Sequence, residues 1–110
     1  MTNELPVEIF DSLYRLARAE GVGQTYWADS SNTKQPRIAD LAARKIPFSL
    51  RRLEQLVPGL KKQIGRELVD TWAVKILKEY KHLPKTTRLL MGEVMEIDED
   101  FLIGVVYERT

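Results

Sequence analysis

The chain lacks cysteine and has a single histidine, His82, among its 110 residues. Without cysteine there is no disulfide framework, no thiolate zinc site and no cysteine nucleophile. One imidazole cannot build a histidine-rich metal site, and no carboxylate or hydroxyl residue is spaced to orient it for acid–base chemistry. Glycine-rich phosphate loops and metal-ligand spacings are also missing from the sequence. We therefore expect no enzyme, no bound metal and no cofactor.

Long apolar runs are also lacking, since the longest spans six positions, residues 101–106. A helix that crosses a membrane needs about 20 predominantly apolar residues. The first fifteen residues carry three acidic side chains and no basic stretch of the kind that opens a secretory signal. The length suits one unit with a modest core. These observations predict a small cytoplasmic protein that does not interact with membranes.

Basic and acidic residues are nearly balanced overall, and the formal net charge is only +1. The distribution along the chain is uneven, however, with −3 over residues 1–32, +7 over residues 33–66 and −3 over residues 67–110. A basic segment inside a neutral protein is the kind of footprint that nucleic-acid phosphates attract. A solvated Lys/Arg face would give the same composition, so charge alone leaves both interpretations open.

Apolar residues recur at helical spacing through the first 80 residues and predict five helices. The first begins at Pro6 and is ended by Gly21, and Asn32, which tolerates a positive φ, turns the chain after the second. Ser49 is expected to cap the fourth helix. We expect Pro58 and Gly59 to end the fourth helix and to separate it from the fifth. The second to fifth helices should cover about residues 24–30, 35–43, 50–57 and 60–80.

The last stretch of the chain has two interpretations. Thr86 or Thr87 and Asp98 can each cap a short helix, which gives helices over residues 88–96 and 99–107. Residues 88–95 and 101–107 are also rich in β-forming side chains around an acidic turn, which would suit a β-hairpin.

Two short helices joined by a tight turn, residues 24–30 and 35–43, have the layout of a helix-turn-helix. The residue spacing around them is more specific. A small residue and a glutamine open the first helix, an apolar–Ala pair follows, an isoleucine comes ten residues after the alanine, and a Pro-Ser-Leu-like entry leads into the next helix: Gly23, Gln24, Trp27, Ala28, Ile38, Pro47, Ser49, Leu50, Leu53 and Leu56. This pattern, over about residues 7–65, resembles the lambda-repressor/Cro-like (XRE-type) helix-turn-helix family. Ser31 departs from it at a position that is usually apolar, Asn32 replaces the usual turn glycine, and Pro47 comes one residue early.

The resemblance implies a mainly α fold. The five predicted helices would form a lambda-repressor-like helix-turn-helix fold, with residues 1–66 as its DNA-binding domain. Residues 67–110 would be a C-terminal extension, of short helices or a β-hairpin, that packs on this domain and serves dimerisation or a partner.

The same resemblance places the helix at residues 35–43 in the major groove of DNA. Gln35 would pair with adenine and Arg37 with guanine, while Lys34 at the helix entrance would meet a base or a phosphate. Asp40 would either accept from a cytosine amino group or support Arg37 one turn away.

Further positions would hold the DNA backbone without reading sequence. Gln24 would donate to a phosphate at the start of its helix, and Arg44 and Lys45 would do so from the loop that follows the recognition helix. For Arg51 and Arg52 a backbone contact and a solvated helix face are equally open. Exposed aromatic residues could instead stack on nucleobases, but Trp27 occupies the buried apolar position of the family and is expected in the core.

The function that the resemblance implies is a sequence-specific double-stranded DNA-binding transcription regulator, either a repressor or a phage or mobile-element control protein. It would bind a palindromic operator as a homodimer. The apolar stripe of Leu68, Trp72 and Ile76, together with residues 89–107, is the expected dimer surface. The alternatives are an antitoxin-like protein, whose C-terminal segment binds a toxin partner, and a helical adaptor that contacts only proteins.

Overall fold

A computed structural model describes residues 4–107, and all regular structure in that part of the chain is helical except one isolated bridge between Glu4 and Ser49. The prediction of a mainly α fold is confirmed. Over residues 4–107 there are seven helices: α1 (Val7–Ala19), α2 (Gln24–Ser30), α3 (Gln35–Ala42), α4 (Leu50–Ile64), α5 (Arg66–Glu79), α6 (Lys85–Val94) and α7 (Glu99–Val106). None of these helices is long and apolar enough to cross a membrane.

The first three helices lie where the sequence predicts them. Helix α1 buries one stripe of apolar side chains, which includes Ile9 and Leu13. It ends where Gly21 adopts a φ of +76°, a conformation in which glycine meets no steric penalty. Asn32 turns the chain after α2 with a φ of +53°, as expected. Short connections therefore hold α2 and α3 next to each other, with residues 31–34 between them.

The prediction of a break at Pro58 and Gly59 is wrong, because α4 runs unbroken from Leu50 to Ile64. Proline removes one backbone hydrogen bond, the one that the carbonyl of Glu54 would have accepted. Glu54 is exposed, so water can replace that bond. Beyond the proline, Gly59 and Leu60 are buried against neighbouring helices, which keeps the segment helical. The chain breaks at Gly65 instead, where φ is +94°.

The last part of the C-terminal extension forms two short helices, α6 and α7, and the alternative of a β-hairpin is wrong for the residues that the structure describes. Asp98 caps α7 as predicted, since its Oδ2 accepts from the backbone N–H of Phe101 at 3.2 Å. The predicted threonine cap is wrong, because α6 begins earlier, at Lys85, directly after Pro84. A proline before a helix has no N–H to satisfy and a φ that suits helix entry.

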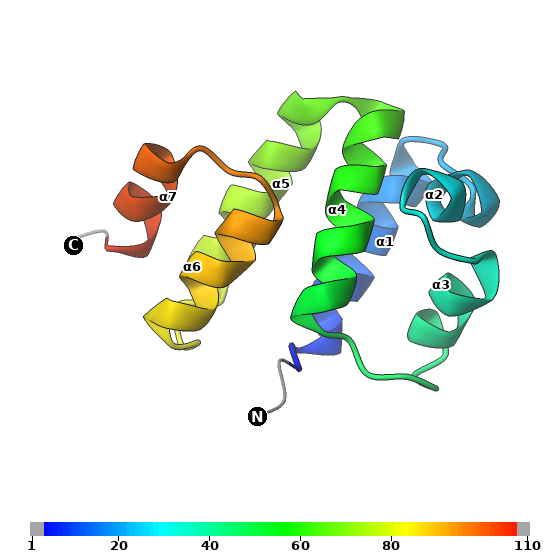
Figure 1. Ribbon diagram of the computed structural model, residues 1–110, viewed down its shortest axis with the longest axis horizontal. Helices are drawn as coiled ribbons and strands as arrows, with labels where there is room; N and C mark the ends of the chain where they lie inside the picture. The colour runs from blue at the N-terminus through cyan, green and yellow to red at the C-terminus, as the bar shows by residue number, and fades with distance from the viewer. Residues whose placement is uncertain (1–3, 108–110) are drawn as a thin grey trace.

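Helix α4 lies in the middle of the molecule (Figure 1), with α2 and α3 on one side and α5, α6 and α7 on the other. Helices α3 and α7 lie towards opposite ends of the long axis, and the Cα atoms span 40 × 31 × 20 Å. Buried apolar side chains from all seven helices form one cluster. The expected boundary at residue 66 falls at the α4–α5 junction, and the hydrophobic core continues across it.

The expected dimer stripe on α5 is largely covered within the chain. Trp72 is 8% exposed and Ile76 is 1% exposed, whereas Leu68 remains on the surface. The indole nitrogen of Trp72 donates to Oγ of Ser12 on α1 at 2.9 Å. On the other side, buried Arg88 of α6 donates twice to the carbonyl of Leu77, at 3.1 and 2.7 Å. The expectation that Trp72 and Ile76 form the dimer surface is therefore wrong, because α4, α6 and α7 pack against α5 within the chain.

Candidate functional site

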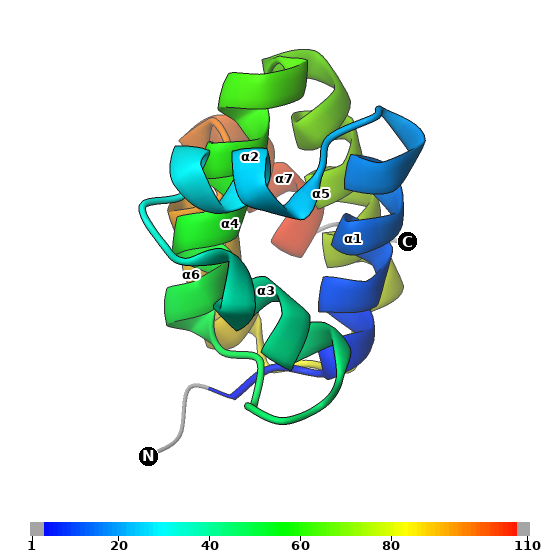
Figure 2. The same cartoon turned by 90° about the vertical axis from the view of Figure 1, so that its right-hand side faces the viewer.

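All seven predicted site residues lie on α2, on α3 or in the connections next to α3, which face the viewer in Figure 2. Their side chains are exposed at four positions and partly buried at three. The exposed ones are Lys34, Arg37, Arg44 and Lys45, and the partly buried ones are Gln24, Gln35 and Asp40. The fold therefore brings the predicted residues together on one side of the molecule.

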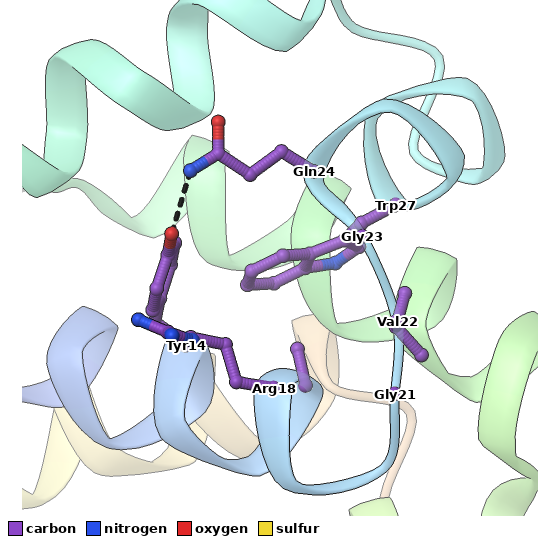
Figure 3. A pocket seen from close by; sticks show the side chains of 8 residues that line it. Tyr14, Arg18, Gly21, Val22, Gly23, Gln24 and Trp27 are labelled. Carbon is purple, nitrogen blue, oxygen red and sulfur yellow. Dashed lines mark hydrogen bonds between the residues drawn. The ribbon is translucent and has the colours of Figure 1, made fainter.

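Two of these residues are joined directly by their side chains. Gln35, the first residue of α3, donates through Nε2 to Oε1 of Gln24, the first residue of α2, at 2.5 Å. Gln24 in turn donates through Nε2 to the hydroxyl of Tyr14 on α1 at 2.6 Å (Figure 3). We call this series Tyr14–Gln24–Gln35 the glutamine chain. It connects the beginnings of α2 and α3 to the middle of α1.

Sequence reasoning missed Tyr14. Its neighbour one turn earlier on α1, Phe10, is fully buried, and the two rings lie 5.7 Å apart. In the sequence Tyr14 therefore looks like one more member of an apolar stripe. The only available signal was its hydroxyl, since a tyrosine at the edge of a core usually directs that group to a polar partner.

A hollow of about 300 Å³ lies beside the glutamine chain. Figure 3 shows it between the end of α1 and the start of α2, with Tyr14, Gln24 and Trp27 around it. The guanidinium of Arg18 lies 5.9 Å from the centre of the Tyr14 ring, within the range of a cation–π contact. Trp27 belongs to the core as predicted, because only 1% of it is exposed. Its indole N–H donates to the carbonyl of Leu56 at 2.9 Å.

Helix α3 presents one face to the core and another to solvent. Ile38 and Leu41 are fully buried, while Lys34 and Arg37 are exposed. Of the two roles expected for Asp40, the ion pair with Arg37 is not formed, although both residues lie in the described part of the chain.

Arg44 already has a carboxylate partner. It adopts a φ of +62° just after α3, and its guanidinium contacts both carboxylate oxygens of Asp11 on α1, at 2.9 and 2.7 Å. The hydrogen bond to Asp11 raises the pKa of Arg44 above its usual value. This pair fastens the end of α3 to α1. Lys45, the next residue, is exposed.

A second hollow, of about 240 Å³, lies where the start of α3 meets the start of α4. Ser49 caps α4 as predicted, and its Oγ accepts from the backbone N–H of Arg52 at 3.4 Å. The Arg52 side chain donates to the carbonyl of Pro47 at 3.2 Å. The residues that line this hollow are mostly polar or basic: Thr33, Arg37, Ser49, Arg51, Arg52 and Gln55.

Within residues 4–107 no group of three or more His, Asp or Glu side chains is arranged to hold a metal ion. The predicted site residues carry amide, guanidinium and ammonium groups, together with the carboxylate of Asp40. Comparisons of the chain with protein-family models, with curated proteins and with solved structures find no match in any of the three.

Proposed function

We propose that the protein is a sequence-specific double-stranded DNA-binding transcription regulator of the lambda-repressor-like helix-turn-helix type. Helix α3 would enter the major groove, and α2 would lie across the DNA backbone. The protein would act as a repressor or as a phage or mobile-element control protein, as a dimer on a palindromic operator in the cytoplasm. It would use neither a catalytic site nor a cofactor.

The observation that carries this proposal is the hydrogen bond between Gln24 and Gln35. A side-chain amide offers two N–H donors and a carbonyl oxygen with two acceptor positions. After bonding to Gln24, the Gln35 amide keeps one N–H and its oxygen, which is the pair of groups that adenine requires at N7 and N6. Gln24 likewise keeps one N–H for a phosphate. The bond thus sets a base-reading group and a backbone-holding group at a fixed distance.

The distribution of charge supports the same function. Lys34, Arg37 and Lys45 are exposed around α3, and Arg51 and Arg52 line the adjoining hollow. Acidic residues gather at the other end of the molecule, where α7 begins with Asp98, Glu99 and Asp100. A basic face with an acidic opposite end favours one orientation of approach to a polyanion.

Arg44 can contact a phosphate of the DNA backbone, as predicted, while it keeps its ion pair with Asp11. A guanidinium has five N–H donors, and Asp11 is bonded through one donor on each of Nη1 and Nη2. The remaining donors can reach a phosphate while Asp11 keeps the side chain in place. Arg44 would therefore contact the DNA backbone from a fixed position.

Selection of bound duplexes from a random pool, with measurement of the size of the complex in solution, tests the proposal. We expect one enriched palindromic motif and two protein chains per site.

Arg37→Ala should weaken operator binding by about 1–3 kcal/mol and remove the preference at one base pair. Lys45→Ala, the matched charge removal, should weaken all sequences alike and lower the salt slope by about one. A pool without enrichment, or equal losses on operator and random DNA for Arg37→Ala, would overturn the assignment.

The antitoxin-like alternative is favoured by one observation at the other end of the molecule. Phe101 is 56% exposed and lies at a groove between α5 and the start of α7, whose lining includes Val74 and Ile97. An exposed aromatic side chain at an apolar groove is typical of protein–protein contacts. Purification of the protein in a one-to-one complex with a different chain, lost on Phe101→Ser, would select this alternative.

A further inference from the structure

We propose that Tyr14 is a positioning residue for base reading: its hydroxyl, acting through Gln24, holds the Gln35 amide in one place on the face that would meet the DNA. This inference rests on the proposed function. It concerns a residue that does not itself reach the DNA and that lies on α1, outside the two helices of the helix-turn-helix.

The argument begins with the orientation of the amides. Because Nε2 of Gln24 donates to Tyr14, the oxygen of the same amide must point the other way, towards Gln35. Gln35 then has to present its own Nε2 to that oxygen. The outer edge of Gln35 is left with one order of groups, an N–H on the side of Gln24 and the oxygen beyond it.

Tyr14 can act as an anchor because its ring is held by the core. Phe10 lies 5.7 Å from it and Trp27 lies 6.3 Å from it, measured between ring centres. Arg18 covers one face of the ring. Both Phe10 and Trp27 are almost completely buried. The position of the hydroxyl is thus determined by packed aromatic rings, and the hydrogen bonds pass that fixed position on to two side chains at the surface.

Without the hydroxyl, the Gln24 amide loses the partner on α1 that holds it in place. The amide is then free to move and to rotate, and Gln35 can follow, because an N–H of Gln24 bonds the oxygen of Gln35 as well as the reverse. Each order of groups matches a different donor–acceptor pattern in the major groove. Loss of the hydroxyl should therefore broaden the base preference at one position and leave the contacts with phosphates unchanged.

The test is Tyr14→Phe, which keeps the aromatic packing and removes only the hydroxyl. Binding is measured on the operator selected by the unaltered protein and on duplexes substituted at each base pair. Discrimination should fall roughly threefold to tenfold at one base pair, the value of one hydrogen bond, and the salt slope should not change. Tyr80→Phe is the matched control, since Tyr80 is also partly buried but lies at the end of α5, away from α2 and α3. It should leave discrimination unchanged.

A double-mutant cycle with Gln24→Ala separates positioning from a general structural effect. If Tyr14 acts through Gln24, Tyr14→Phe should have no further effect on discrimination once Gln24 is alanine. Unchanged discrimination in the single variant, or an equal loss of affinity on every sequence together with a lower melting temperature, would overturn the role of Tyr14. If the unaltered protein selects no DNA sequence at all, the proposed function itself fails, and the two failures are therefore distinguishable.

Discussion

Ser31 and Gly59 lie so close together that residue 59 has no room for a side chain. Ser31, at the end of α2, is 5% exposed, and its hydroxyl is buried without a hydrogen-bond partner among the described residues. Gly59 of α4 lies against it so closely that a β-carbon there would come within 2.8 Å of the Ser31 Cα. In the sequence, Ser31 stands at a position that is usually apolar in the helix-turn-helix pattern. The structure fills that place with the backbone of α4, which approaches closely because residue 59 has no side chain.

Gly59→Ala should therefore destabilise the fold. We expect the free energy of unfolding to fall by roughly 1–3 kcal/mol, because either α2 or α4 must move to make room. Urea denaturation followed by circular dichroism measures this. Gly104→Ala on α7 is the matched control, since a β-carbon there meets no atom within 4 Å. Replacement of a helical glycine by alanine at an open position should stabilise by roughly 0.5–1 kcal/mol. If the two variants changed stability alike, close packing would not be the reason for Gly59.

The conformation or contact of a single residue could be predicted from the sequence where it depends only on that residue and its immediate neighbours. The cap formed by Ser49 and the positive φ of Asn32 follow from their own chemistry and immediate neighbours. The glutamine chain joins residues 10 and 11 positions apart, and the Arg44–Asp11 pair joins residues 33 positions apart. No spacing rule connects such positions, because their proximity is decided by how α1 packs against α3.

At the level of whole helices, one lysine joins three of them. The ammonium of Lys61 on α4 lies 2.7 Å from Oδ1 of Asp70 on α5 and donates to the carbonyl of Met95, at the end of α6, at 2.5 Å. Its side chain is only 10% exposed. The carbonyl end of a helix carries partial negative charge, so a cation is favoured there. Lys61 thus secures the junction between the two halves of the chain.

Lys61→Met should weaken this junction, because it keeps an apolar stem of similar length but leaves Asp70 and the Met95 carbonyl without the ammonium. A loss of about 1.5–3 kcal/mol in the free energy of unfolding is expected, the usual range for a hydrogen bond to a charged group. Lys62→Met is the control, because Lys62 is the exposed neighbour and should change stability by less than about 0.5 kcal/mol. Equal values for the two variants, measured by urea denaturation, would remove Lys61 from this role.

The end of a helix could be predicted from the sequence where no tertiary contact opposes the residue that ends it. Gly21 ends α1 and Asn32 follows α2, and in both places local preference and packing agree. At Pro58 they conflict, and packing wins, since Val57 and Leu60 on either side are fully buried. A proline in mid-helix costs about one hydrogen bond, which an exposed turn can satisfy with water. The sequence carries the signal to break but not the information that tertiary contacts override it.

At the level of the molecule, the C-terminal helices complete the core. Helices α6 and α7 both pack against α5, so their removal would expose apolar residues of that helix. A chain that ends at Tyr80 should therefore lose cooperative thermal unfolding and aggregate. Circular dichroism melting and sedimentation measure this directly. A sharp transition and a monomeric species for that fragment would show that the first five helices fold independently.

If the protein binds DNA as a dimer, as proposed, the 40 Å length of the molecule limits how two copies can share one duplex. With α3 near one end and α7 near the other, a pair joined back to back at α7 would hold its two recognition helices well beyond the roughly 34–36 Å that separates successive major grooves on one side of DNA. Such a pair would fit half-sites about two turns apart. The spacer between them would go untouched, and its flexibility, rather than its bases, would then influence which operators are occupied.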